Sequence, residues 1–404
     1  MDSLVVANNK FCFDFFQVIS KDDSHKNIFF CPLSLSAAFG MIRLGARNDS
    51  AHQIDEVLHF DELSKNESKE LDSCLKSNKQ PESSSDESKL LSCYFGKLLS
   101  RLDRIKNHYI MSMANRLYGE QGFPICQEYS DGVIQFYHTT IESVDFQKST
   151  EKSRQMINFW VESQCQGKIK ELFSKDAIND ATVLVLVNAV YFKAKWEKNF
   201  DRENTVDASF FLSESEQKNV KMMNQRGLFR IGFIEELQAQ ILEMRYTMGK
   251  LSMFVLLPSP SADNVKGLQE LERKISYEKI VAWSGSENMS EETVAISFPQ
   301  FTLEDTYDLN SIIQDMGITD IFDETKADLT AISPSPSLYL SKILHKTFVE
   351  VDEDGTQAAA ASGPVGVTKS LPSWVEFNAN HPFLFFIRHN KTQTILFCGR
   401  VCSP

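Results

Sequence analysis

The sequence predicts an α+β fold, because helical and strand-like segments both occur along its length. Residues 182–192 are almost all apolar and β-branched, which is typical of a central strand covered on both faces. Apolar residues recur at helical spacing in residues 90–102 and around Ile157 and Val161. These segments indicate a large core containing both helices and sheet.

The chain is acidic, which limits the partners that it can be expected to bind. Its 404 residues include 42 Lys and Arg against 55 Asp and Glu, so the net charge is −13. This balance argues against general nucleic-acid binding. No run of about 18 apolar residues is present, so no contact with a membrane is expected. Length alone would allow two or three domains.

The N-terminal residues predict a helix rather than an export signal. Residues 1–19 lack a basic segment followed by an apolar core and a small-residue cleavage site, so we expect a cytoplasmic protein without a cleavable signal peptide. Some extracellular release stays an open alternative. The eight cysteines form no CxxC pair and no disulfide or zinc spacing. We therefore expect reduced, mainly buried thiols, no metal site and no cofactor.

Residues 61–90 are polar and rich in Ser, and are expected to form a disordered insertion between helices. The helix at residues 90–102 follows, and basic side chains lie on it or just after it: Lys97, Arg101, Arg104 and Lys106. A solvated face is the preferred interpretation of this thin basic patch on an acidic chain, and polyanion binding is the alternative.

The segment that organises the chain runs from His345 to Trp374. It begins as a strand, residues 346–351, and an acidic run and Gly355 follow. Small, mostly neutral residues come next, before a second strand from Trp374 to Phe377. One interpretation is a flexible surface loop. The other is a loop that becomes a strand, since insertion of a loop into a sheet is a known switching transition.

The small residues of this loop suit insertion. In an extended chain one face would carry Thr356, Ala358, Ala360 and Ser362, all of which are small and uncharged. A buried charge at these positions would strongly oppose insertion. Pro364 lacks a backbone N–H and is unfavourable in a central strand, so it is expected to slow the completion of insertion.

Four motifs recur in the order and spacing of one family. They are the hinge pattern of Glu353, Gly355, Thr356 and residues 358–361, and the runs NIFFCPLSLS at residues 27–36, NAVYFKAKW at residues 188–196 and FPQFTLEDTYDL at residues 298–309. The chain thereby resembles the serpin family, in its ovalbumin-like, intracellular branch, clade B. The resemblance covers nearly the whole chain outside residues 61–90.

The resemblance implies a single serpin domain over residues 1–404, with about nine helices and three β-sheets. Residues 353–373 would form the hinge and an exposed reactive-centre loop. In inhibitory members the scissile residue lies about fourteen positions after the hinge Gly, which here is Lys369. The reactive bond would then be Lys369–Ser370.

The resemblance also implies the mechanism and the buried polar residues that control it. Ser34, Asn188 and His345 would form the shutter beneath the main sheet, and Trp196 would pack in the breach where the loop enters. A Ser usually stands where this chain has Cys31.

A lysine at the reactive bond suits trypsin-like serine proteases, whose specificity pocket has a carboxylate at its base. We therefore expect an inhibitor of proteases with Lys or Arg preference. It would trap the protease as a suicide substrate and act as a monomer without catalytic residues of its own.

Two other functions are alternatives to inhibition. A non-inhibitory serpin-fold binding protein would be cleaved as a simple substrate, and the neutral hinge argues against it. A hydrolase has little support because GxSxG, HExxH and phosphate-binding motifs are absent from the sequence. A Ser-His-Asp set assembled only in space is not excluded by sequence.

Overall fold

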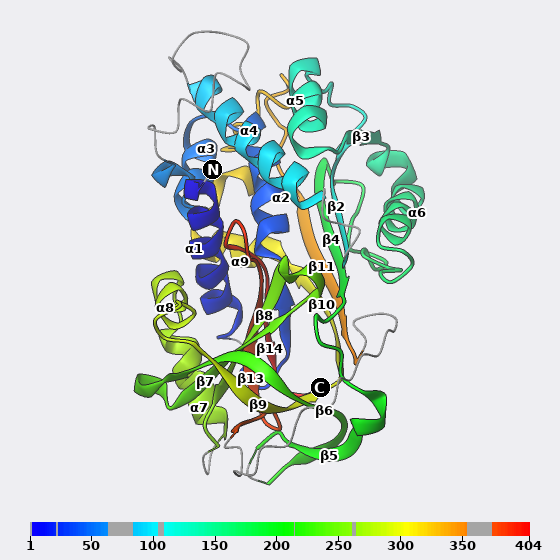
Figure 1. Cartoon of the computed structure of the whole chain (residues 1–404). Coiled ribbons are helices and arrows are strands. Elements are labelled where there is room, and N and C mark those ends of the chain that lie inside the picture. The colour runs from blue at the N-terminus through cyan, green and yellow to red at the C-terminus, as the bar shows by residue number, and fades with distance from the viewer. Residues whose placement is uncertain are drawn as a thin grey trace, which may run out of the picture.

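Helices and two sheets make up the part of the chain that the computed structural model describes (Figure 1). The described residues are 2–21, 23–63, 84–103, 109–213, 215–260, 264–353 and 374–404. The α-helices among them are α1 (Asp2–Ile19), α2 (Pro32–Gly45), α3 (Asn48–Val57), α4 (Ser84–Asp103), α5 (Gln127–Tyr137), α6 (Phe146–Gln164), α7 (Asn264–Lys274), α8 (Tyr277–Trp283) and α9 (Leu309–Met316). The α+β class is confirmed.

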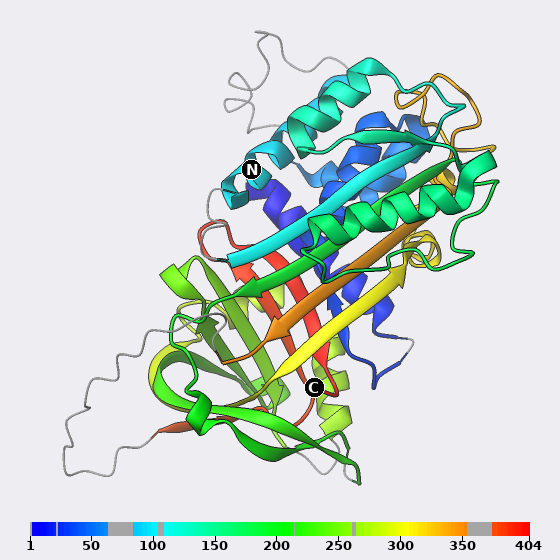
Figure 2. The same ribbon diagram turned by 90° about the vertical axis from the view of Figure 1, so that its right-hand side faces the viewer.

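The first sheet has five strands in the order β10–β11–β4–β2–β3. Their bounds are β10 (Phe301–Asp308), β11 (Lys342–Val351), β4 (Leu184–Ala194), β2 (Tyr109–Glu120) and β3 (Ile141–Val144). Helix α6 lies across one face of this sheet, and α2 lies behind the other (Figure 2). Both faces are therefore covered, which explains the continuous apolar sequence of β4.

Side chains of β4 alternate between these two helical layers. Val185, Val187 and Ala189 pack in the cluster beneath α6, whereas Leu186 and Val190 pack in the main core on the side of α2. This alternation follows from the two-residue period of a strand.

The second sheet has nine strands, in the order β1–β14–β13–β8–β7–β6–β9–β12, with β5 also paired to β6. Their bounds are β1 (Ile28–Phe30), β5 (Val206–Phe211), β6 (Gln217–Ile234), β7 (Ala239–Arg245), β8 (Leu251–Pro258), β9 (Ser290–Pro299), β12 (Val375–Asn378), β13 (Phe383–His389) and β14 (Thr394–Val401). The long β6 pairs with both β7 and β9. The second and third expected sheets are thus joined through β6 into one hydrogen-bonded sheet.

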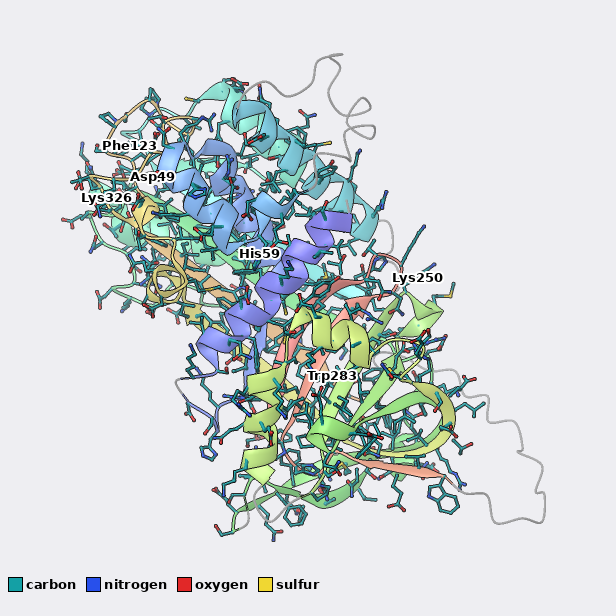
Figure 3. The ribbon with its side chains drawn as sticks, turned by 90° about the vertical axis from the view of Figure 1, so that its left-hand side faces the viewer. Asp49, His59, Phe123, Lys250, Trp283 and Lys326 are labelled. Carbon is teal, nitrogen blue, oxygen red and sulfur yellow. The ribbon has the colours of Figure 1, made fainter. Side chains whose placement is uncertain are left out.

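Helices α1 and α2 pack against β14 of the nine-stranded sheet, and α7 packs against β8. Figure 3 shows α1 running lengthwise beside His59, with Trp283 of α8 packed below it. His59 Nε2 lies 2.6 Å from a carboxylate oxygen of Asp14 in α1, which ties the end of α3 to this helix. No helix in the described ranges is long and apolar enough to cross a membrane.

Three local features differ from the sequence expectation. Helix α4 begins at Ser84, inside the predicted insertion, because a polar segment without helix breakers can extend a helix. Helix α6 begins at Phe146, well before the apolar positions around Ile157 that predicted it, because Asp145 caps it by accepting a hydrogen bond from Lys148 N at 2.9 Å. Cys93 is disulfide-bonded, so the expectation of reduced thiols is wrong at that position.

Candidate functional site: the shutter and breach

The centre of the five-stranded sheet carries a row of buried polar side chains. In the strand register, Asn188 of β4 lies opposite His345 of β11 on one side and Asn115 of β2 on the other. Asn188 and His345 are fully buried. A buried amide or imidazole without a partner would cost about 1–3 kcal/mol, so each of these groups needs a hydrogen bond within the fold.

Ser34 in the first turn of α2 supplies most of these bonds. Asn188 Nδ2 donates to the Ser34 carbonyl oxygen at 2.8 Å and to its Oγ at 2.9 Å. Ser34 Oγ donates to Asn115 Oδ1 at 2.9 Å, and Asn115 Nδ2 donates back to the Ser34 carbonyl at 3.1 Å. One serine thus ties α2 to two adjacent strands of the sheet.

His345 joins the same network through both ring nitrogens. Its Nε2 accepts a hydrogen bond from the Cys31 backbone N–H at 3.2 Å, so the ring proton must sit on Nδ1, which lies 2.5 Å from Asn188 Oδ1. Burial lowers the pKa of His345 to about 3. The imidazole is therefore neutral at physiological pH, in the tautomer that donates to Asn188.

Cys31 occupies the N-cap position of α2 where the family pattern has Ser. Its Sγ accepts a hydrogen bond from Ser34 N at 3.4 Å, so the thiol does the capping. Burial raises the pKa of the thiol to about 12, which keeps it protonated. A weak sulfur acceptor thus replaces a hydroxyl at this cap, while the backbone N–H of the same residue still bonds to His345.

Sequence reasoning missed Asn115, which completes the shutter. It is one of several polar residues in β2, and nothing in the alternation of that strand separates it from Ser112. Its partner Ser34 lies 81 residues away in sequence, so only the folded arrangement identifies it.

Trp196, the predicted breach residue, lies beside the C-terminal end of β11. The indole stacks on Tyr246 with ring centroids 4.5 Å apart, and its Nε1 donates to the Asp352 carbonyl oxygen at 2.9 Å. Lys193 lies 3.0 Å from a carboxylate oxygen of Asp352. An aromatic contact, a hydrogen bond and an ion pair therefore fix the chain just before the loop.

Glu353 is the last described residue before the loop, and its side chain is only 6% exposed. Its Oε1 accepts a hydrogen bond from Thr205 Oγ1 at 2.6 Å, and its carbonyl oxygen accepts one from Phe200 N at 3.1 Å. The other predicted hinge and reactive-bond residues lie outside the described residues: Gly355, Thr356, Ala358, Ala360, Ser362, Pro364, Lys369 and Ser370. The same is true of Arg104 and Lys106 after α4.

The shutter is a structural network rather than a catalytic one. Ser34 and His345 could suggest a hydrolytic pair, but both ring nitrogens of His345 are engaged and both side chains are fully buried. A substrate could not reach them without opening the sheet. Within the described residues, no group of three His, Cys, Asp or Glu is placed to hold a metal ion.

Comparison with known proteins defines the class of protein. The family model described as serpin (serine protease inhibitor) matches residues 6–404, and the chain belongs to the serpin family, in its ovalbumin-like branch, clade B. Human serpin B12, also called yukopin, is 80% identical over 405 residues, with 100% of both chains covered. Leukocyte elastase inhibitor A of Mus musculus is 40% identical over 404 residues, again with 100% of both covered.

A solved structure supports the same assignment. Uncleaved ovalbumin superposes with a TM-score of 0.86 at 35% sequence identity, and the match covers 100% of both chains. The serpin fold predicted from sequence is therefore confirmed.

Proposed function

We propose that this serpin inhibits trypsin-like serine proteases by trapping them. Cleavage at Lys369–Ser370 would release the loop, which would then insert as a strand between β4 and β11. The observation that carries the proposal is the direct parallel pairing of these strands, from Lys342–Val185 to Val349–Phe192. A strand that turned back from the end of β11 into this junction would be antiparallel to both of its neighbours.

The strand directions favour insertion energetically. The loop leaves the end of β11, so an inserted strand would run back antiparallel to β11 and also antiparallel to β4. One parallel junction would thereby be replaced by two antiparallel junctions, which are slightly more stable per residue. Thr356, Ala358, Ala360 and Ser362 would face the core and place no charge in it.

The shutter determines how easily the two strands part. Most of its hydrogen bonds connect each strand to α2 rather than directly to the other strand, and the bond between Asn188 and His345 is the one that must break. Ser34 and Cys31 would keep their bonds to the separate strands. The network can therefore hold the uncleaved sheet closed and still allow it to open.

The target class rests on Lys369. A lysine side chain can make a charge-assisted hydrogen bond with the carboxylate at the base of a trypsin-like pocket. The name of leukocyte elastase inhibitor A, one of the relatives of this chain, supports inhibition as a function within the branch. We further propose that the protein acts as a monomer in the cytoplasm.

The test is to mix the purified protein with trypsin and analyse the products by denaturing electrophoresis and thermal melting. An SDS-stable complex of higher mass and a cleaved form that melts above the uncleaved form are expected. The matched control is Thr356→Arg, which would place a charge against the core and should convert trapping into simple cleavage. Clean cleavage after Lys369 in both proteins, without a rise in melting temperature, would identify a non-inhibitory binding protein instead.

A further inference from the structure

One face of the nine-stranded sheet exposes an aromatic ring and an aliphatic side chain beside the end of the loop. The Trp374 surface is defined here as Arg226, Leu228, Thr293, Trp374 and Glu376, on strands β6, β9 and β12 and the residue that precedes β12. We propose that this surface binds the protease that attacks the loop, and so determines which trypsin-like enzyme is inhibited. This inference rests on the proposed function.

The strand register places these residues on a single face. One row across the three strands consists of Arg226 in β6, Ala295 in β9 and Glu376 in β12. The neighbouring row on the same face contains Leu228 and Thr293. Trp374 continues that second row, one residue before Val375, which pairs with Val294. The inward positions of β9 and β12, such as Val294 and Phe377, are buried in the core. The Trp374 surface is therefore the outer face of a sheet whose inner face packs against the core.

The apolar members of this face are open to solvent. Leu228 is 54% exposed and Trp374 is 42% exposed, on either side of Thr293. Single exposed apolar residues are common, but two in one row beside an arginine resemble the composition of a binding hot spot, where Trp and Arg are enriched.

Arg226 holds the Trp374 ring in place. Its guanidinium carbon lies 3.8 Å from the ring centroid, which is a cation–π contact. Arg226 is exposed, so its N–H groups can still meet a carboxylate of a partner. A ring fixed in advance loses little conformational entropy on binding, which favours affinity. The geometry suits a partner surface that offers an apolar side chain next to an acidic one.

The position of Trp374 identifies the partner. Trp374 lies five positions after Lys369, so the reactive bond can lie at most about 18 Å from it along the chain. A protease domain of about 200 residues has a radius of gyration of about 16 Å. An enzyme bound at Lys369–Ser370 is therefore large enough to reach the Trp374 surface, which lies on the C-terminal side of the reactive bond.

The experiment measures the second-order rate constant for reaction with trypsin. Trp374→Ala and Arg226→Ala should each lower this constant by about fivefold or more, as hot-spot truncations do, with the stoichiometry of inhibition unchanged. The matched control is Phe159→Ala, which removes a ring that is 73% exposed on α6, and its rate should stay at the wild-type value. Equal rates for Trp374→Ala and the wild type would overturn the inference.

Two further measurements separate this inference from the proposed function. If the wild type is cleaved without trapping, the proposed mechanism fails, and the fall in kcat/KM for cleavage of Trp374→Ala still tests the surface. A synthetic peptide of residues 364–373 lacks the surface and serves as a reference for the active site of trypsin alone. A second copy of the chain is the alternative partner for this surface, and sedimentation tests it. If the wild type forms a dimer that Trp374→Ala dissociates, the surface belongs to that second copy and the inference is overturned.

Discussion

The two sheets differ most at their centres. In the five-stranded sheet, the middle of the β4–β11 junction is parallel and carries Asn188 and His345. In the nine-stranded sheet, the β8–β13 junction is antiparallel and carries Phe254 and Phe386, whose rings stack with centroids 4.9 Å apart. One junction depends on directional hydrogen bonds, and the other on apolar burial.

The difference fits the proposal that the five-stranded sheet opens and the nine-stranded sheet does not. Hydrogen bonds of the shutter can be exchanged for bonds to an incoming strand, so parting β4 from β11 need not leave polar groups unpaired. Parting β8 from β13 would expose aromatic rings to water without replacement, at about 25 cal/mol for each Å² of apolar surface. The first junction suits the proposed insertion of the loop, and the second would hold the fold during that insertion.

The largest effect is expected from Phe386→Ala in the aromatic junction. Removal of this buried ring should lower the free energy of unfolding by about 3–5 kcal/mol, because it leaves a cavity against Phe254. Urea unfolding of the uncleaved protein measures the loss, with Phe159→Ala on the exposed face of α6 as the control. A fall in the free energy of unfolding below about 1 kcal/mol would mean that the aromatic junction contributes little to the stability of the fold.

Acid should weaken the polar junction next. The pKa of His345 is lowered from an ordinary 6.5 to about 3 by burial, so the folded state resists a proton that the unfolded state accepts. The neutral, buried His345 makes its full contribution to the free energy of unfolding above pH 6.5. This contribution is lost as the pH falls toward 3. Between pH 7 and 5 the loss from this residue should be about 2 kcal/mol.

The variant His345→Gln isolates that contribution. Burial also lowers the pKa values of His381 and His389, and both proteins retain these residues, so the difference between the two stability profiles reports on His345. The variant should lose less stability than the wild type between pH 7 and 5 in urea unfolding. Parallel profiles would mean that His345 does not make the shutter sensitive to acid.

The smallest effect is expected from Cys31→Ser. A hydroxyl is a better N-cap acceptor than a thiol, so the variant should gain up to about 1 kcal/mol in stability. The gain should raise the temperature at which the uncleaved form unfolds and leave the cleaved form almost unchanged if the cap matters mainly while the sheet is closed. A loss of stability would indicate that the volume of the sulfur contributes more than its capping.

Much of the fold could be predicted because the relevant patterns are local. Residues 182–192 predicted the strand β4 within two residues at each end. Strand β10 was not identified, although its side chains alternate strictly between buried and exposed positions. Asp305 interrupts the apolar side of that alternation, and Tyr307 OH donates to its carboxylate at 3.2 Å, a partner that periodicity does not reveal.

Motifs and their spacing along the chain were enough to predict the family, the central strand β4 and three polar residues of the shutter. The folded arrangement was needed to show that Asn115 joins the network, that β6 merges two sheets and that Leu228 lies in one row with Trp374. Each of these facts depends on which strands pair and in which register. Pairing joins residues far apart in sequence, and no local pattern encodes their separation.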